Sequence, residues 1–299
     1  MGERPPSLDP SALLLLTLPP LFWASNAIIG RLVVGSIAPL ALNNLRWLVA
    51  GLLLLPFAVR PLMRHAALIR ARWRMLALMG FLAIGCYNSL QYLALQTSTP
   101  MNVTLIGSSG PIFILLIGSW FFNERMTARQ LAGGTVSMAG VLVVLAHGQL
   151  DLLLSLHING GDLYMLLATL CWSVYTWLLR RHRPPGLPLA LMLFVQIAFG
   201  VVLFAPLVIA EALSGVTVMH WSWQNGAIVL YVAIFPALLS YFCWDRGVTR
   251  VGAQLPVFFT NLTPVFAAVM SAFWLGDLPQ PYHLVGLVLI IAGIRLAQR

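Results

Sequence analysis

Residues 103–141 read VTLIGSSGPIFILLIGSWFFNERMTARQLAGGTVSMAGV, and a looser copy of this stretch lies 153 positions further along the chain. The copies share a proline with its aromatic neighbour, an acid and a glycine: Pro111-Ile112-Phe113 and Pro264-Val265-Phe266, Glu124 and Asp277, Gly140 and Gly293. Because three kinds of residue recur at one fixed offset, we interpret the chain as two homologous halves.

A weaker copy links the upstream segments at an offset of 149 positions. It pairs Trp23 with Trp172, Arg31 with Arg180, and Pro39-Leu40-Ala41-Leu42 with Pro188-Leu189-Ala190-Leu191. We therefore expect a first repeat over residues 1–148, an external linker over residues 149–160 and a second repeat over residues 161–299.

The composition predicts an all-α membrane protein with many spans. Hydrophobic residues make up 60% of the chain, charged residues make up 8%, and the mean hydropathy is +0.90. These values lie outside the range of soluble domains. We expect ten helices, each long enough to cross a hydrocarbon core of about 30 Å. Their predicted spans are 12–34, 39–59, 75–95, 101–122, 129–147, 162–180, 188–211, 226–245, 253–275 and 281–298.

The placement of arginine predicts the orientation in the membrane. All 17 basic residues are arginine. Except for Arg31 and Arg46, they lie in the N-terminal segment, after the second, fourth, sixth and eighth spans, or at the C-terminal end. The positive-inside rule assigns these places, and both termini, to the cytoplasm. The basic charge is thus a topology signal, and we expect no nucleic-acid partner.

Five spans per half is an odd number, so the second half must enter the membrane upside down relative to the first. Inverted-topology repeats around a central cavity are typical of carriers that expose a midplane site to each side in turn. We therefore expect two inverted five-helix repeats and transport by alternating access.

Ionisable side chains are expected only at the margins of the bundle. The eight acids and six histidines fall in tails, in loops or near the ends of predicted spans. A proton-coupled pump keeps an ionisable group near the midplane, and an enzyme needs a cluster of such groups. We therefore expect a facilitator with no catalytic residues.

No metal, nucleotide or cofactor is expected. Cys86, Cys171 and Cys243 are widely separated in the sequence and are interpreted as separate buried side chains, without a disulfide or a metal site. A Walker-type phosphate loop is absent, which excludes ATP as the energy source.

Aromatic and amide side chains at the centres of spans are the candidate cavity lining. Amides at mid-depth avoid lipid, so their helix faces should point inward, together with aromatic residues in the same phase. The predicted cavity residues are Trp23, Asn26, Tyr87, Asn88, Gln91, Trp172, Tyr175, Tyr241 and Trp244. Such a lining suits an uncharged or zwitterionic solute with an apolar or aromatic side chain.

Arg46 lies about two turns into the second span, with no acid at its depth. It would either reach the external headgroups or backbone carbonyls, or face the cavity and contact a substrate carboxylate. The sequence leaves both interpretations open.

Two prolines interrupt predicted spans at equivalent positions. Pro111 and Pro264 each remove an intrahelical hydrogen bond. The preceding segments, which contain Ser108 and Asn261, can satisfy the freed carbonyls. These sites are either static kinks or hinges that contact substrate.

Together these features resemble paired EamA domains. The first copy reads Gly110-Pro111-Ile112-Phe113, Asn123-Glu124-Arg125 and Gln130-Leu131-Ala132-Gly133, and its second span has Pro39 with Leu45-Arg46-Trp47. The second copy departs at Asp277, at Leu278 in place of Arg125, and at Val195 in place of Arg46. The resemblance covers residues 12–298. It implies the drug/metabolite transporter superfamily, most similar to its aromatic amino-acid exporters. The implied fold is a ten-helix basket around a central cavity, which moves by rocking of helix groups near spans three and four and spans eight and nine.

The resemblance and the uncharged lining predict a bacterial inner-membrane exporter of amino acids. Aromatic substrates are favoured, and methionine and threonine are within the predicted range. Its partners would be the substrate and the lipid bilayer, and a monomer is compatible with the sequence. The alternative is an exporter of drugs or other neutral metabolites from the same superfamily, and a channel or an intramembrane enzyme is less favoured. We expect substrate selection where the repeats differ: Tyr87 and Ser240, Asn88 and Tyr241, Gln91 and Trp244, Arg46 and Val195.

Overall fold

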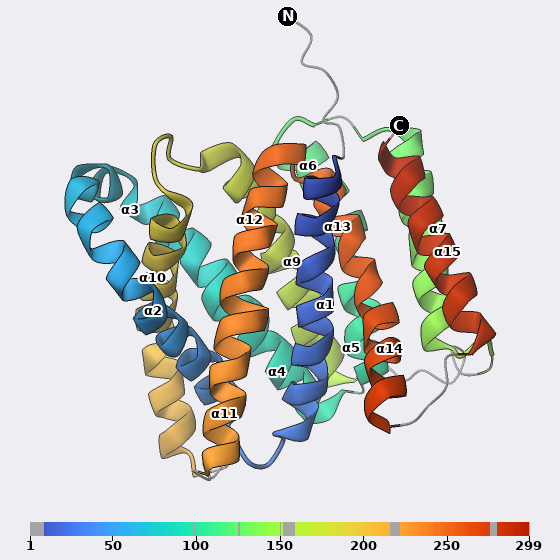
Figure 1. Cartoon of the computed structure of the whole chain (residues 1–299), viewed down its shortest axis with the longest axis horizontal. Coiled ribbons are helices and arrows are strands. Elements are labelled where there is room, and N and C mark those ends of the chain that lie inside the picture. Colours follow the sequence, from blue (N-terminus) through green and yellow to red (C-terminus); the bar gives the residue numbers. More distant parts are fainter. Residues whose placement is uncertain are drawn as a thin grey trace, which may run out of the picture.

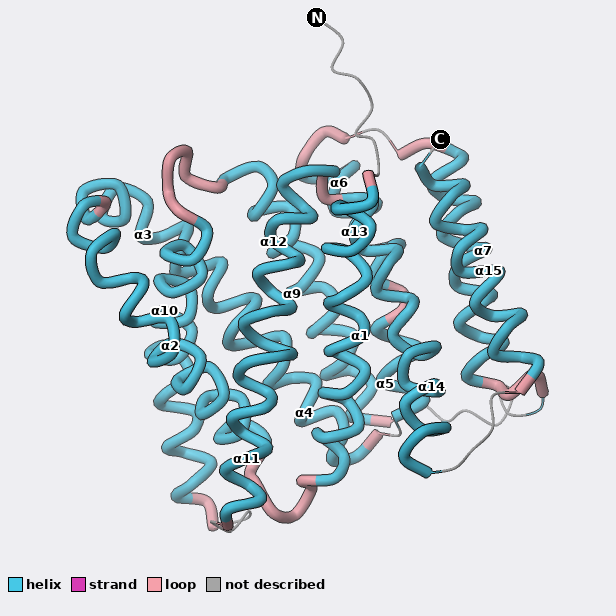
Figure 2. Tube along the Cα trace, in the orientation of Figure 1, coloured by secondary structure: helices cyan, strands magenta, loops and turns pink. Residues whose placement is uncertain are grey.

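The predicted spans are helical in the computed structural model, which describes residues 9–98, 100–124, 126–149, 151, 159–215, 222–275 and 280–298. No strand occurs among these residues (Figure 2). The predicted all-α class is therefore confirmed. Most of the predicted linker, together with Arg125, Asp277 and Leu278, lies outside the described residues.

The helices follow one another through the chain with few long interruptions. The N-terminal half contains α1 (Pro10–Leu32), α2 (Pro39–Arg64), α3 (Ala66–Gly80), η1 (Phe81–Cys86), α4 (Tyr87–Thr97), α5 (Pro100–Gly107), α6 (Gly110–Phe121) and α7 (Ala128–Leu145). The C-terminal half contains α9 (Gly160–His182), α10 (Leu189–Leu213), α11 (Trp223–Val232), η2 (Ala233–Leu239), α12 (Ser240–Val251), α13 (Gln254–Phe259), η3 (Thr260–Leu262), α14 (Thr263–Leu275) and α15 (Pro281–Gln298). Within the described residues, seven helical segments are long and apolar enough to cross a membrane.

Three helices extend well beyond their predicted spans. The second span was expected to end at residue 59, but α2 continues to Arg64. The third span was expected to begin at residue 75, but α3 begins at Ala66 and carries Arg70, Arg72 and Arg74. The eighth was expected to end at residue 245, but α12 continues to Val251. An apolar count marks only the part of a helix that suits hydrocarbon. The backbone hydrogen bonds continue into the polar residues beyond it.

A π-helical segment occurs at the same place in each half. The segments η1 and η2 end at Cys86 and Leu239, which are equivalent at the 153-residue offset. A π turn disturbs the regular hydrogen-bond ladder and is frequent at functional sites. Side chains bond to its carbonyls here: Tyr241 Oη donates to Ala83 O at 2.7 Å, and Trp23 Nε1 donates to Pro236 O at 3.1 Å. Ala83 and Pro236 are themselves equivalent positions.

Both helices that contain an equivalent proline break just before it. In the first half, α5 ends at Gly107 and α6 begins at Gly110, one residue before Pro111. In the second half, a 3₁₀ turn separates α13 from α14, which begins one residue before Pro264. Proline lacks an amide hydrogen and restricts the residue before it, which explains the position of both breaks.

The last helices of the two halves, α7 and α15, pack closely together (Figure 1). A Cβ added to Gly133 would lie 2.6 Å from Gly293 O, and one added to Gly140 would lie 2.7 Å from Gly286 O. The earlier glycine of each helix thus faces the later glycine of the other, so α7 and α15 run antiparallel. Only glycine permits this approach of the two backbones.

One edge of the bundle gathers the start of α1 and the end of α15 (Figure 1). The Asp9 carboxylate accepts from Ala12 N at 2.7 Å and from Ser11 Oγ at 3.0 Å, and these bonds hold the pKa of Asp9 below its ordinary value. Ser11 Oγ in turn accepts from Arg250 Nη1 at 2.6 Å. The start of α1 is thereby joined to the end of α12.

The outer surface of the bundle is apolar. Phe57 and Trp120 are each 71% exposed, and Leu213 is 82% exposed. Water-soluble monomers rarely expose many large apolar side chains together, whereas a bilayer solvates them. The aromatic side chains Trp47, Tyr241 and Trp244 are buried inside.

Candidate functional site

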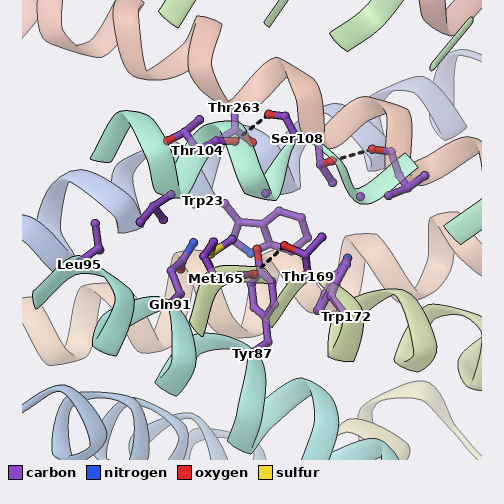
Figure 3. A pocket seen from close by; sticks show the side chains of 15 residues that line it. Trp23, Tyr87, Gln91, Leu95, Thr104, Ser108, Met165, Thr169, Trp172 and Thr263 are labelled. Atoms are coloured by element: carbon purple, nitrogen blue, oxygen red, sulfur yellow. Dashed lines mark hydrogen bonds between the residues drawn. The ribbon is translucent and has the colours of Figure 1, made fainter. Parts of the chain in front are cut away.

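A cavity lies at the centre of the bundle, between the broken helices of the two halves and α1, α4 and α9. The described residues that line it are Trp23, Tyr87, Gln91, Leu95, Val103, Thr104, Gly107, Ser108, Gly110, Met165, Thr169, Trp172, Val257, Thr260 and Thr263. In Figure 3 the ring of Trp23 lies between Thr104, Ser108 and Thr263 on one side and Gln91, Tyr87 and Met165 on the other. None of these lining residues carries a charge.

The cavity has room for several water molecules or a small solute. The volume open to the centres of water molecules is about 80 Å³, and a single water needs roughly 10–15 Å³ by the same measure. The lining combines aromatic faces with threonine and serine hydroxyls and one amide. It can hydrogen-bond a polar solute and stack on a flat apolar one, without an ion pair.

The broken helices contribute lining residues from equivalent positions. Thr104 pairs with Val257, Gly107 with Thr260, and Gly110 with Thr263, all at the 153-residue offset. Trp23 and Trp172, which are equivalent at the 149-residue offset, meet in the cavity wall with ring centroids 5.2 Å apart and planes at 88°. Such edge-to-face contacts are favourable because the positive edge of one ring meets the negative face of the other. The two repeats therefore build one cavity together.

Several lining hydroxyls were absent from the residues predicted from sequence. Thr104, Thr169, Thr260 and Thr263 are small and abundant in membrane helices, so none stands out alone. A signal did exist for three of them. At the 153-residue offset, Thr260 is equivalent to Gly107 and Thr263 to Gly110. Together with Thr104, these positions are three residues apart along the repeat, which places them on one face of a helix.

Five of the predicted residues line the cavity, and the others lie around it. The lining includes Trp23, Tyr87, Gln91 and Trp172 from the predicted cavity set, and Ser108 from the predicted hinge set. Asn261 is buried and donates from Nδ2 to Ser137 Oγ on α7 at 2.8 Å. Pro111 and Pro264 lie in the first turn of the helices that follow the breaks.

Tyr175, Tyr241 and Trp244 form, with Trp47, a layer behind Trp172 that we call the aromatic barrier. The ring centroid of Trp172 lies 5.3 Å from that of Tyr175, 5.4 Å from that of Tyr241 and 5.2 Å from that of Trp244. Trp47 meets Tyr241 edge-on at 4.7 Å. All four barrier side chains are nearly or fully buried. They close the cavity on this side.

Asn88 and Tyr241 are equivalent residues that contact each other. Asn88 Nδ2 donates to Tyr241 Oη at 3.3 Å, and Tyr241 Oη donates to the carbonyl of Ala83. A residue that contacts its own equivalent lies where the two repeats meet. Neither side chain is among the described residues that line the cavity.

Asn26 and Arg46 lie together in a buried polar cluster. Arg46 Nη1 donates to Asn26 Oδ1 at 3.2 Å and to Tyr92 Oη at 2.9 Å, and Tyr92 Oη donates to Asn26 Oδ1 at 2.8 Å. The guanidinium lies over the Trp47 ring, 5.0 Å from its centroid, which is a favourable place for a cation. Arg46 is 0% exposed. The sequence interpretation in which it reaches the headgroups or backbone carbonyls is therefore wrong, because partners on α1 and α4 hold it inside.

Asp245 corrects the expectation that acids lie only at the margins. It lies within α12, not at its end, and is 0% exposed. Its Oδ1 accepts from Tyr175 Oη at 2.9 Å. Asp162 is also buried, but it caps α9 through Asn159 N and bonds to Ser98 Oγ. Acids therefore do enter the bundle, and Asp245 adjoins the aromatic barrier.

A second hollow lies on the other side of the barrier. It is lined by Glu124, Trp177, Arg180, Arg181, Val251, Gly252, Ala253 and Gln254. Arg181 and Glu124 form an ion pair there. Along α9 the order is thus cavity at Thr169 and Trp172, barrier at Tyr175, and hollow from Trp177 to Arg181. Along α9 the barrier therefore lies between the cavity and the hollow.

Two of the cysteines meet in the structure, although their sequence separation argued for separate sites. Cys86 on η1 and Cys171 on α9 lie close enough for their thiols to interact, and neither forms a disulfide. They adjoin the lining residues Tyr87 and Trp172, whose ring centroids are 5.0 Å apart. The expectation of isolated cysteines is wrong here because η1 packs directly against α9.

Comparisons with known proteins agree with this architecture. The model of the EamA-like transporter family matches residues 10–146 and again residues 159–298. An uncharacterized transporter of Bacillus subtilis, YyaM, is 29% identical over 73% of this chain and 71% of its own. A probable terminal-alkyne amino-acid exporter of Streptantibioticus cattleyicolor is 27% identical over 75% of this chain and 73% of its own.

More distant relatives match nearly the full length. A probable amino-acid metabolite efflux pump of Salmonella typhimurium is 22% identical over 91% of this chain and 89% of its own. A solved crystal structure aligns with a TM-score of 0.74 at 21% identity, over 96% of this chain and 97% of that chain, and so shares its fold. The predicted family is confirmed: this chain belongs to the EamA-like transporter family of the drug/metabolite transporter superfamily, as a multi-pass membrane protein with two EamA repeats.

Proposed function

We propose that this protein is a bacterial inner-membrane exporter of amino acids that works by alternating access. Aromatic amino acids are its favoured substrates, and methionine and threonine are within its range. It carries them down their own gradient through the central cavity. The observation that supports this proposal best is an uncharged cavity in which equivalent tryptophans, Trp23 and Trp172, meet beside threonine hydroxyls from both halves.

The lining favours a zwitterion with a flat side chain. Ring faces at Trp23, Tyr87 and Trp172 offer stacking, and each aromatic pair contributes roughly 0.5–1.5 kcal/mol beyond the area it buries. The carboxylate and ammonium groups of an amino acid carry opposite charges, so hydroxyls, Gln91 and the broken-helix backbone suffice to satisfy them. A relative that is a probable amino-acid exporter supports the same substrate class.

We further propose ten membrane crossings, arranged as two inverted five-helix repeats with both termini in the cytoplasm. The antiparallel contact of α7 and α15 supports the inversion. The start of α1 and the end of α15 lie at one edge of the bundle, which supports an even number of crossings (Figure 1). The arginines at that edge, including Arg180, Arg181 and Arg250, support its assignment to the cytoplasmic side.

Counterflow in liposomes tests the function. Purified protein is reconstituted in vesicles loaded with unlabelled phenylalanine, and entry of labelled phenylalanine, tryptophan, methionine and threonine is followed. A carrier gives a transient accumulation of label above equilibrium, whereas an open channel does not. If none of the four amino acids exchanges faster than in empty vesicles, the amino-acid proposal fails.

A second candidate function is export of drugs or other neutral metabolites, because an uncharged aromatic cavity also accepts flat apolar compounds. Growth of cells that overproduce the protein separates the two. Protection against amino-acid analogues supports the amino-acid exporter, whereas protection against cationic dyes alone supports the drug exporter.

A further inference from the structure

Asp245 is a carboxyl group enclosed by protein with only part of its hydrogen-bonding capacity used. Its side chain is 0% exposed. Oδ1 accepts from Tyr175 Oη at 2.9 Å, whereas Oδ2 has no hydrogen-bond partner among the described residues. The ion pair within the described part of the chain joins Arg181 to Glu124 and leaves Asp245 out. A carboxylate in such a place would carry a charge that no ion pair among the described residues compensates.

Asp162 shows what a fully satisfied buried acid looks like in the same molecule. It is 6% exposed, Oδ2 accepts from Asn159 N at 2.9 Å, and Oδ1 accepts from Ser98 Oγ. Both of its oxygens therefore have donors, as a carboxylate requires. Among the described residues, Asp245 has a donor to only one of its two oxygens. A neutral carboxylic acid therefore suits this closed site far better than an anion does.

The position of Asp245 connects its charge to the opening of the barrier. Along α12 and α13 the order is Tyr241 and Trp244 in the aromatic barrier, then Asp245, then Val251 to Gln254 in the hollow. The Tyr175–Asp245 hydrogen bond joins α9 to α12 between the hollow and the cavity. A path that connects the two spaces would have to pass this bond. Separation of α9 from α12 at this level would open the path and admit water to Asp245.

Few other groups can compensate its charge. The titratable and charged groups that act on Asp245 are Tyr175 on α9, Arg183 beyond the end of α9, and Tyr241 on its own helix. Among the described side chains, α1, α13 and η2 present no titratable group to it. On α10, Glu211 is occupied in capping α2 through Leu40 N and Ala41 N. Water is thus the main source of stabilisation for the ionised form.

We propose that Asp245 is a proton-operated latch on the aromatic barrier. With the proton bound, the neutral carboxyl and Tyr175 hold α9 and α12 together and the path to the hollow stays closed. When the proton leaves to water in the hollow, the anion requires hydration, and the barrier opens. Because the same side takes up and releases this proton, the latch regulates the rate of transport without driving it. This inference rests on the proposed carrier function.

The first test is the pH dependence of exchange. Counterflow of labelled phenylalanine is measured with equal pH inside and outside the vesicles, from roughly pH 8 to roughly pH 5. The ionised form is the one that opens, so exchange falls as the pH falls, by about tenfold per pH unit once the pH is below the midpoint of a single ionising group. A flat profile for the wild-type protein overturns the latch.

Variants assign the effect to Asp245. Asp245→Asn resembles the protonated acid, so we expect slow exchange at every pH, while Asp245→Glu restores the pH dependence. Asp162→Asn is the matched control, because it alters a buried acid away from the barrier and should keep the shape of the wild-type profile. A wild-type profile in Asp245→Asn contradicts the proposal.

A second measurement needs no substrate and so separates this inference from the proposed function. Spin labels replace Arg180 on α9 and Arg246 on α12, both exposed, in protein freed of its three native cysteines. The distance between labels is measured by pulsed electron resonance at low and high pH. We expect a longer distance at high pH, absent in Asp245→Asn. If the distance changes with pH but no amino acid is exchanged, only the amino-acid proposal is refuted. If amino acids are exchanged but the distance does not change with pH, only the latch is refuted.

Discussion

Tyr87 lines the cavity in the first half, and its equivalent in the second half is the much smaller Ser240. Its ring packs against that of Trp172 at a centroid distance of 5.0 Å with the planes tilted by 42°, whereas the equivalent Ser240 is buried and bonds to Phe235 O. A side chain that occurs on one half only can recognise one end of an asymmetric solute.

We therefore predict that Tyr87→Ala weakens exchange of aromatic amino acids. Loss of one ring contact removes roughly 0.5–1.5 kcal/mol, which is a twofold to tenfold increase in the concentration of phenylalanine that half-saturates exchange. Threonine exchange should change less. Tyr164→Ala is the control, since Tyr164 is 45% exposed on the outside of α9. Equal losses in both variants, or none in Tyr87→Ala, would remove Tyr87 from the site.

Arg46 is expected to stabilise the fold and not to bind the substrate carboxylate. Its Nη1 donates to Asn26 and Tyr92, whereas Nε and Nη2 have no hydrogen-bond partner among the described residues, and the side chain is absent from the described cavity lining. In Arg46→Gln, the ratio of phenylalanine binding to phenylethylamine binding should stay within about twofold of the wild-type ratio. A tenfold fall, about 1.4 kcal/mol, would show that Arg46 does contact the carboxylate.

At the scale of helices, the packing of α7 on α15 depends on the absence of side chains at four glycines. Gly140→Ala would bring a Cβ to 2.7 Å from Gly286 O, and backbone atoms cannot yield as a flexible side chain can. We expect a loss of about 1–3 kcal/mol, typical of overpacking, seen as a lower thermal unfolding temperature in detergent. Gly226→Ala, in α11 with open space around it, is the matched control. Equal unfolding temperatures for the two variants would show that α7 and α15 can separate without cost.

Cys86 and Cys171 allow the movement of η1 against α9 to be stopped. Oxidation by diamide joins the two sulfurs and transfers two electrons and two protons to the reagent. If the two segments separate during transport, exchange should fall to the level of empty vesicles and return after reduction. Cys86→Ala should be insensitive to diamide. An intact exchange rate after complete disulfide formation, verified by mass spectrometry, would show that η1 and α9 move together.

The sequence predicted the helices better than it predicted the polar contacts between them. Apolar runs are a local signal, so the predicted spans match the helices closely, and they fell short mainly where α2, α3 and α12 continue into polar residues. The π segments η1 and η2 have no comparable local signal. The burial of Asp245 depends on Tyr175, which lies 70 positions away in the sequence. Such pairings are set by tertiary packing, which a single sequence does not reveal.

At the scale of the whole molecule, the two repeats build one cavity but differ in the residues around it. Trp23 and Trp172 have kept the same role, and Asn88 and Tyr241 have changed but still contact each other. Alignment of the two copies of the repeated stretch also places the lining threonines on one helix face, so this face could have been predicted from the sequence. The residues that differ between the repeats were predicted to select the substrate, and this stays a prediction.

The proposed topology can be measured on the intact chain. Fusion of a fluorescent protein that folds only in the cytoplasm to the C-terminus should give fluorescent cells. Insertion of a short labelling tag near Gln149 should be reached by an impermeant reagent added outside. A C-terminal fusion that is dark yet expressed, or a tag near Gln149 that is labelled only after cell lysis, would contradict the orientation.

The crossed glycines of α7 and α15 have the symmetry expected of a contact between two copies of one sequence. A contact in which Gly133 meets Gly293 while Gly140 meets Gly286 is self-complementary, like the interface of a symmetric homodimer. Two separate copies of one half, inserted in opposite orientations, would meet through this same face. Each substitution in that face would then change both sides of the interface. In a single chain each copy of this face can change independently of the other. Ser137 and Ile290 occupy equivalent positions, and Ser137 is now free to accept a hydrogen bond from Asn261 while Ile290 remains apolar.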